Sequence, residues 1–218
     1  MSSRIDSPQI HDLLQIDPDS LPGIAAPGWV LVALHSCPWV VVRRVPPPLG
    51  KIAIGVRGNT RDMRWGGFIS KNSVISIVRP MDLIAIYNSS TLIPRMPAIG
   101  VLRQVIERWQ RFDVTWGPTG SVAFELASGQ HVTTESSDLD IAIRASRRLR
   151  VEHARSLWQE VSDLRPNVDV RVETPECGFS LHEYACVSSG RLLLRYRDGV
   201  CLGKDPWSPR KTALGIAA

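Results

Sequence analysis

Lysine is scarce in this chain: only four of its 26 basic residues are lysines, and the rest are arginines. A GC-rich genome accounts for much of such a bias, while guanidinium groups also suit bidentate binding of phosphate. Long apolar runs are missing as well, since stretches such as Trp29–Leu34 and Trp39–Val42 are far too short to span a membrane. The N-terminal segment has no apolar core of the signal-peptide type, so we expect a cytoplasmic protein without membrane association.

The cysteines form none of the patterns that bind metal or build a disulfide framework. There are four, and they include no CxxC pair and no histidine spacing typical of zinc sites. We therefore expect reduced, mostly buried thiols. Hydrophobic residues make up 44% and charged residues 22% of the 218 positions, a balance typical of globular proteins.

Basic residues are concentrated in one part of the sequence. Between Pro38 and Met81, eight basic residues stand against one acidic residue, Asp62. Codon bias alone would spread arginine evenly, so this excess predicts a site for an anion, either nucleic acid or a compact molecule rich in phosphate. The segment lacks regularly interleaved aromatic residues, which favours the small molecule. The eight are Arg43, Arg44, Lys51, Arg57, Arg61, Arg64, Lys71 and Arg79.

The pattern of apolar residues divides the chain into two parts. Segments rich in β-branched residues predict strands over 28–34, 38–44, 51–57 and 73–78. A short helix is expected over 80–87, and a segment rich in proline and small residues then places a domain boundary near Pro94. The expected fold class is α+β, with a small β-rich N-terminal domain over residues 1–94 and an α/β domain over residues 95–218.

Helices and strands alternate in the second part. Leu102, Val105, Ile106 and Trp109 recur at helical spacing and predict an amphipathic helix. The pattern beyond it predicts strands over 112–116, 139–143, 168–172 and 191–195, and helices over 121–127, 151–164 and 181–188.

Two aspartates lie at the start of one of these strands. In the sequence SDLDI, Asp138 and Asp140 share one strand face, while Leu139 and Ile141 face the core. Neighbouring carboxylates repel unless a cation lies between them, and oxygen ligands at this spacing suit Mg²⁺, which also binds substrate phosphates. A single pair of this kind is more often a solvated strand end, so the neighbouring segments must decide between the two interpretations.

A glycine-serine pair and a second acidic strand accompany the aspartates. Gly120 and Ser121 lie between a predicted strand and a predicted helix, where a phosphate can approach free amides, although Ser121 also suits an ordinary helix start. In NVDVRVET, Asp169, Arg171 and Glu173 share one strand face. Asp169 is the expected third carboxylate and base, Glu173 is the alternative base, and Arg171 is an alternative salt-bridge partner of Asp169.

Gly-Ser, Asp-x-Asp on a strand and a third aspartate on a later strand resemble the DNA polymerase β-like nucleotidyltransferase superfamily over about Trp116 to Val172. The separation of 17 positions between Ser121 and Asp138 exceeds that of minimal members. With RRVPPPLG, IGVRGNTRDMRWGG and VDVRVETPECGFSLHEYA, the chain also resembles the phosphoribosyl-dephospho-CoA transferases of malonate decarboxylase operons. These enzymes are also called malonate decarboxylase holo-[acyl-carrier-protein] synthases.

The resemblance implies an activity and assigns residues to it. The family transfers the 2′-(5-phosphoribosyl)-3′-dephospho-CoA group from 2′-(5-triphosphoribosyl)-3′-dephospho-CoA to a serine of the acyl carrier protein subunit of malonate decarboxylase, and diphosphate leaves. It implies a nucleotidyltransferase-fold C-terminal domain, in which Asp138 and Asp140 bind Mg²⁺ with Asp169 as third carboxylate, and in which Gly120 and Ser121 form a phosphate loop. Arginines in the matching N-terminal motifs are expected to bind the donor: Arg43, Arg44, Arg57, Arg61 and Arg64.

Two other classes of function stay open. A nucleotidyltransferase that places a simple nucleotide on a protein or small-molecule hydroxyl would share the carboxylates but has no need of an arginine-rich domain. A non-enzymatic nucleic-acid-binding module is disfavoured because all three aspartates are present. Donor choice separates the first class from the main interpretation, and steep salt dependence of binding to random DNA would favour the second.

Overall fold

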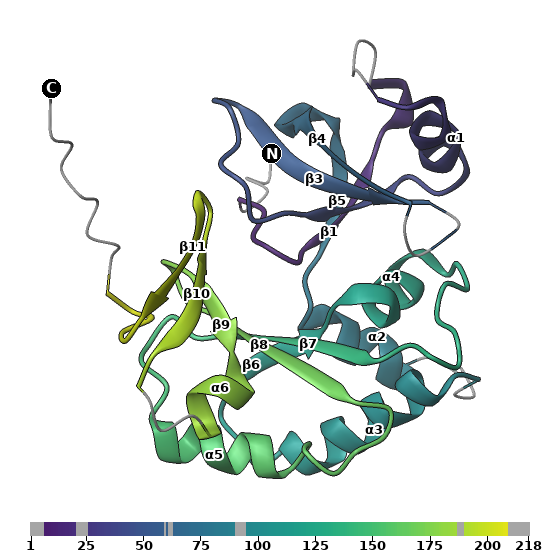
Figure 1. Cartoon of the computed structure of the whole chain (residues 1–218). Coiled ribbons are helices and arrows are strands. Elements are labelled where there is room, and N and C mark those ends of the chain that lie inside the picture. The colour runs from purple at the N-terminus through teal and green to yellow at the C-terminus, as the bar shows by residue number, and fades with distance from the viewer. Residues whose placement is uncertain are drawn as a thin grey trace, which may run out of the picture.

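Two sheets, one above the other, organise the molecule (Figure 1). The computed structural model describes residues 7–20, 26–58, 60, 63–89, 95–186 and 190–208. The N-terminal sheet is antiparallel in the order β4-β3-β2-β1-β5. Its elements are β1 (Leu13–Ile16), a 3₁₀ turn (Pro18–Ser20), α1 (Gly28–Ser36), β2 (Trp39–Val42), β3 (Lys51–Arg57), β4 (Arg64–Ser70), a second 3₁₀ turn (Lys71–Ser73) and β5 (Val74–Val78).

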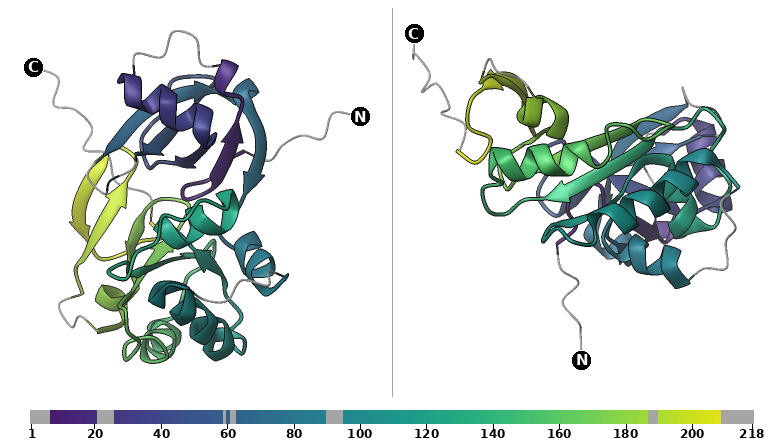
Figure 2. Two further views of the ribbon diagram at one scale, coloured as in Figure 1. Left: turned by 90° about the vertical axis from the view of Figure 1, so that its right-hand side faces the viewer. Right: turned by 90° about the horizontal axis from the view of Figure 1, so that it is seen from below.

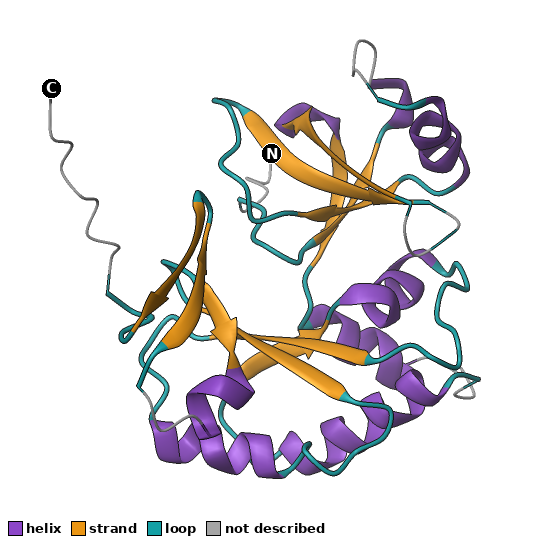
Figure 3. Cartoon of the chain, viewed as in Figure 1, coloured by secondary structure: helices purple, strands orange, loops and turns teal. Residues whose placement is uncertain are grey.

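The C-terminal sheet has the order β11-β10-β9-β8-β7-β6, in which β7 and β8 are parallel and the other pairs are antiparallel. Helices α3, α5 and α6 lie beneath it, on the side away from the N-terminal sheet (Figure 3). The elements are α2 (Asp82–Ser89), α3 (Pro97–Trp109), β6 (Thr115–Pro118), α4 (Gly120–Ser128), β7 (Leu139–Arg144), α5 (Val151–Gln159), β8 (Val168–Glu173), β9 (Gly178–Ser180), α6 (Leu181–Cys186), β10 (Leu192–Tyr196) and β11 (Gly199–Gly203). The α+β fold class is therefore confirmed.

The strand predicted over residues 28–34 is wrong, because this segment forms helix α1. A short apolar run does not by itself distinguish a buried strand from a helix. Helix α1 follows Pro27, and its residues Val30 and Leu34, one helical turn apart, are buried against the N-terminal sheet. Strands β1, β4, β9 and β11 were not predicted, and the predicted strand over 112–116 is shifted to Thr115–Pro118.

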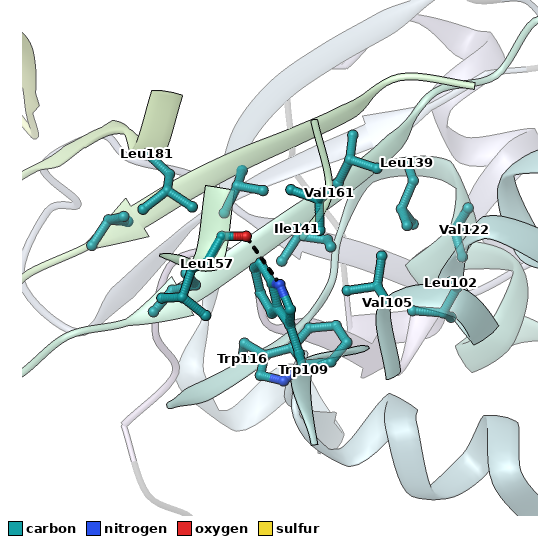
Figure 4. Packing of buried hydrophobic residues seen from close by; sticks show 14 of the residues in the cluster. Leu102, Val105, Trp109, Trp116, Val122, Leu139, Ile141, Leu157, Val161 and Leu181 are labelled. Atoms are coloured by element: carbon teal, nitrogen blue, oxygen red, sulfur yellow. Dashed lines mark hydrogen bonds between the residues drawn. The ribbon is translucent and has the colours of Figure 1, made fainter. Parts of the chain in front are cut away.

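The core of the C-terminal part confirms the helix predicted from Leu102, Val105 and Trp109. These residues are buried on one face of α3, and the Trp109 indole NH donates a 3.2 Å hydrogen bond to the carbonyl oxygen of Leu157 in α5 (Figure 4). Trp116 meets Trp109 edge to face at 5.0 Å between ring centroids. Helix α5 ends at Gln159, earlier than the predicted end at residue 164.

Apolar contacts and buried ion pairs join the two sheets. Leu13 of the N-terminal sheet belongs to the C-terminal core, and Trp39, Val41 and Val78 pack against it. Asp12, which is 1% exposed, pairs with Arg144 at the end of β7. Removal of either partner would leave an uncompensated buried charge and strongly destabilise the protein. The pair therefore fixes the contact between the two sheets.

Helices long and apolar enough to cross a membrane are absent from the described ranges.

Candidate active site

Carboxylates from two neighbouring strands lie side by side on the upper face of the C-terminal sheet. In the parallel register of β7 and β8, Asp140 is directly opposite Asp169. Asp138 immediately precedes β7 and is exposed. Leu139 and Ile141 are fully buried on the other face, which fixes the direction of the aspartates. The fold thus brings together three carboxylates that the sequence separates by up to 31 positions (138 to 169).

Gly120 brings the start of α4 against these carboxylates. It has φ +62°, and a Cβ atom added there would overlap the Asp140 carboxylate. The backbone NH of Thr119 donates a 2.8 Å hydrogen bond to the carbonyl oxygen of Asp140, which ties the helix start to β7. Gly120 is therefore required both for its backbone conformation and for the close approach. Ser121 follows it in the first turn of α4.

Negative charge accumulates at Asp140. Burial raises the pKa of its carboxyl group, and the neighbouring Asp169 and Asp138 raise it further. Arg171 and His11 lower this pKa but do not outweigh the other effects. The site therefore favours a cation or a proton at Asp140.

The other charged side chains of β8 already have partners. Arg171 donates to Asp169 at 3.0 Å, so the salt bridge considered from the sequence exists. Glu173 pairs with Arg44 and also bonds His11, with 2.9 Å between Nε2 and Oε1. Burial alone would raise the pKa of Glu173, but the hydrogen bond and charge of His11 and the charge of Arg44 hold it below its usual range. Glu173 thus joins the two sheets.

His11 lies beside this site and was not indicated by the sequence. It precedes β1, has φ +72°, and lies close enough to Asp140 for its charge to lower the pKa of that carboxyl. No sequence pattern near His11 indicates this position, because the contact depends on how the two sheets meet.

The arrangement of oxygen donors suits Mg²⁺ in the presence of a phosphate substrate. Across the described ranges, no three His, Cys, Asp or Glu side chains converge as a complete metal site. Mg²⁺ usually takes one or two carboxylates and fills its remaining positions with water and substrate phosphates. Asp140 and Asp169, adjacent and partly exposed, meet that requirement, and Asp138 adds charge beside them.

The basic residues of the N-terminal motifs fall into different places. Arg43 lies across β3 and β4, where a Cβ at Gly66 would overlap its guanidinium and a Cβ at Gly55 would come within 3.2 Å of its Cδ. Arg57 and Arg64 are opposite each other in the same two strands, and Arg64 is exposed. The side chains of these three arginines therefore share one face of the N-terminal sheet.

Two arginines do not join this group. Arg44 pairs with Glu173, and its assignment to donor binding stays a prediction. Arg61 lies outside the described residues. Arg57 also has a contact with the C-terminal part, because its Nη2 donates to the Val132 carbonyl oxygen at 3.4 Å.

The long segment between α4 and β7 is held by one buried carboxylate. Glu125 of α4 accepts hydrogen bonds from the backbone NH groups of Val132 and Thr133, at 3.0 and 2.9 Å, and from the Thr133 hydroxyl and His131. Burial would raise its pKa, but these bonds, those of Thr133 first, keep it below its usual value. Glu125 thereby holds the segment between α4 and Asp138 in place.

Replacement of Glu125 by alanine is expected to lower the free energy of unfolding by about 1–3 kcal/mol, because buried donors of Thr133 lose their acceptor. Since the pKa of Glu125 is lowered by folding, its contribution is present at neutral pH and disappears as the pH falls through that lowered pKa. Chemical unfolding at several pH values measures both effects. Glu107→Ala, at an exposed ion pair, is the control, and equal losses in the two variants would contradict the role of Glu125.

Replacement of Gly120 by alanine is expected to reduce catalytic activity at this site by about 100-fold, because the added methyl displaces Asp140 and small misplacements of reacting groups have effects of that size. Gly129→Ala is the matched control, since Gly129 ends the same helix with φ +73° and open space around it. Steady-state rates and thermal unfolding of both variants separate strain from displacement. Equal rates in the two variants would contradict the close approach.

Comparisons with known proteins agree on one family. Residues 9–80 match the model of the phosphoribosyl-dephospho-CoA transferase MdcG N-terminal domain, and residues 85–206 match that of its C-terminal domain. No solved structure matches the chain significantly.

Curated relatives named phosphoribosyl-dephospho-CoA transferase include the proteins of three bacteria. The protein of Pseudomonas fluorescens (strain Pf0-1) is 37% identical over 96% of this chain and 99% of its own length. That of Pseudomonas aeruginosa is 35% identical over 94% and 96%. That of Klebsiella pneumoniae is 33% identical over 92% and 97%.

These matches define the class of protein: the chain is an enzyme, a transferase. It belongs to the phosphoribosyl-dephospho-CoA transferase family, which its two parts match in the order expected.

Proposed function

We propose that this enzyme transfers the 2′-(5-phosphoribosyl)-3′-dephospho-CoA group from 2′-(5-triphosphoribosyl)-3′-dephospho-CoA to a serine of the acyl carrier protein subunit of malonate decarboxylase, with release of diphosphate. The observation that carries the proposal is the opposition of Asp140 and Asp169 beside the start of α4. Membership of the family supports the nature of the transferred group. The three arginines on one face of the N-terminal sheet support a donor with several phosphates.

The reaction is a substitution at the α-phosphorus of the donor. The serine Oγ forms a bond to this phosphorus, the bond from phosphorus to the bridging oxygen breaks, and diphosphate leaves with the electron pair of that bond. Asp169 accepts the proton of the serine hydroxyl, and Arg171, at 3.0 Å from Asp169, orients the carboxylate. Amides at the start of α4 bind phosphate oxygens of the donor.

Mg²⁺ fits Asp140 and Asp169, which would hold it, and Asp138 would add charge beside them. When bound, it neutralises charge on the phosphates in the transition state. We assign the binding of the donor phosphates by cationic side chains to Arg43, Arg57 and Arg64.

Replacement of Arg43 or Arg64 by alanine is expected to weaken donor binding about ten-fold or more, because a charge-assisted contact contributes roughly 1.5–3 kcal/mol. Lysine at either position should restore binding only in part, since it lacks the bidentate fork. Titration calorimetry with the donor measures the effect. Arg103→Ala, on the outer face of α3, is the control, and donor affinity equal to wild type in both test variants would remove these arginines from the site.

Donor choice tests the proposed function against a simpler nucleotidyltransferase. The purified enzyme is given the apo carrier subunit and either ATP or the triphosphoribosyl precursor, and the carrier mass is followed. We expect the mass of the prosthetic group to appear with the precursor and no adenylylation with ATP. Efficient adenylylation would assign the enzyme to the alternative class.

A further inference from the structure

The sheet face that bears the carboxylates continues to an exposed edge. Glu173 lies opposite Gly178 of β9, Gly178 opposite Arg195 of β10, and Arg195 opposite Val200 of β11. Residues paired in this way project from the same side of a sheet. Val200, and Leu202 two positions further, therefore share the face of Asp169.

Val200 and Leu202 form an apolar patch on this face. They are 58% and 65% exposed and adjacent on this face of β11. Val200 lies opposite Arg195, and Leu202 lies opposite the half-buried Leu193. A single exposed apolar side chain is ordinary, but a contiguous patch on an edge strand favours contact with another molecule. The hairpin of β10 and β11 rises beside the N-terminal sheet (Figures 1 and 2).

The charge around this patch is basic. Residues 191–204 contain four basic side chains and one acidic side chain, Asp198. The Nε group of Arg195 is buried and has no hydrogen-bond acceptor among the described residues. Arg197 and Lys204 are exposed. A partner that covers the patch must therefore present acidic groups around an apolar centre. The four basic side chains are Arg191, Arg195, Arg197 and Lys204.

We propose that the face of the β10–β11 hairpin that bears Val200 and Leu202 is the docking surface for the protein that carries the acceptor serine. This inference rests on the proposed function, which requires a folded protein at the carboxylates. Strand β11 lies three strands from β8, roughly 14 Å across the sheet. A folded domain of about 100 residues, with a radius of gyration near 13 Å, spans that distance and presents one serine at Asp169.

A second copy of this chain is a less suitable occupant. Pairing of two β11 edges would bring two basic hairpins together, and like charges across strands are unfavourable.

The experiment measures the KM of the full-length enzyme for the apo carrier subunit and, separately, for the donor. In V200S/L202S and in R197E/K204E, we expect the KM for the carrier to rise about ten-fold or more, with the KM for the donor and kcat at saturating carrier unchanged. Wild-type kcat/KM for the carrier should fall with salt, and that of R197E/K204E should depend less on salt. Ile75→Ser, at a residue of β5 that is also 58% exposed, is the matched control and should leave both KM values unchanged.

Three results would overturn the inference. One is a carrier KM equal to that of wild type in both double variants, and another is a rise in donor KM alone, which would assign the face to the donor. The third is a concentration-dependent dimer that V200S/L202S abolishes, which would assign β11 to a second copy. If wild type itself does not modify the carrier, the proposed function is wrong and the inference is wrong with it. If wild type modifies the carrier and the variants behave like wild type, only the inference is wrong.

Discussion

The Asp140→Ala variant is expected to fold and to transfer the prosthetic group at least about 100-fold more slowly than wild type, because stabilisation of phosphate charge in the transition state contributes several kcal/mol. Asp140 is the central carboxylate: it faces Asp169 across the parallel register and touches the start of α4. Asp138→Ala, which removes the exposed member of the group, is expected to have an effect of the same order. Single-turnover assays in Mg²⁺ measure both.

Stability distinguishes this loss from unfolding. Burial and two neighbouring carboxylates raise the pKa of Asp140, so its charge opposes folding in the absence of a cation. Asp140→Ala should therefore be at least as stable as wild type in metal-free buffer at neutral pH. Asp163→Ala, at an exposed ion pair with Arg108, is the control for both measurements. An Asp140 variant that is folded and nearly as active as wild type would remove this residue from the site.

The Asp169→Asn variant is expected to lose most of its transfer rate while donor binding in Mg²⁺ falls much less. Asparagine keeps the shape and one oxygen ligand, but it cannot accept the serine proton. Rates at saturating donor and carrier, together with donor affinity from calorimetry, separate the two effects. A loss confined to donor affinity would make Asp169 a binding residue alone.

Glu173→Gln is the comparison that decides between the two candidate bases. Glu173 is held by His11 and Arg44, so we expect this variant to lose stability through the contact between the sheets. Its transfer rate should fall less than that of Asp169→Asn. Wild-type rates in Asp169→Asn together with an inactive but folded Glu173→Gln would transfer the role of base to Glu173.

Local pattern predicted much of the C-terminal part but less of the N-terminal part. Helix α3 has a regular stripe at Leu102, Val105 and Trp109, and its period identifies it without tertiary information. Helix α1 is apolar on nearly all sides, so the spacing of its apolar residues does not distinguish a helix from a strand. The sequence therefore predicted a strand there. Strand β1 has only the four residues Leu13–Ile16, and its pairing with β2 and β5 gives it its structure.

The carboxylates of the candidate site could be predicted individually from strand alternation, but their partners could not. The alternation of β8 places Asp169, Arg171 and Glu173 on one face, as predicted. Only the fold distinguishes their surroundings, because Glu173 meets Arg44 from 129 positions away and His11 from 162 positions away. The same long-range contact gives Arg44 a partner that the sequence did not indicate.

Counting both products in one reaction tests most directly whether a carrier serine substitutes at the α-phosphorus of the donor. The enzyme is mixed with the apo carrier subunit and the triphosphoribosyl precursor in Mg²⁺, and carrier mass and free diphosphate are measured over time. We expect one diphosphate for each carrier that gains the prosthetic group, and formation of both products at least about 100-fold more slowly with Asp140→Ala. Diphosphate released without modified carrier, or carrier modified with loss of monophosphate, would contradict it.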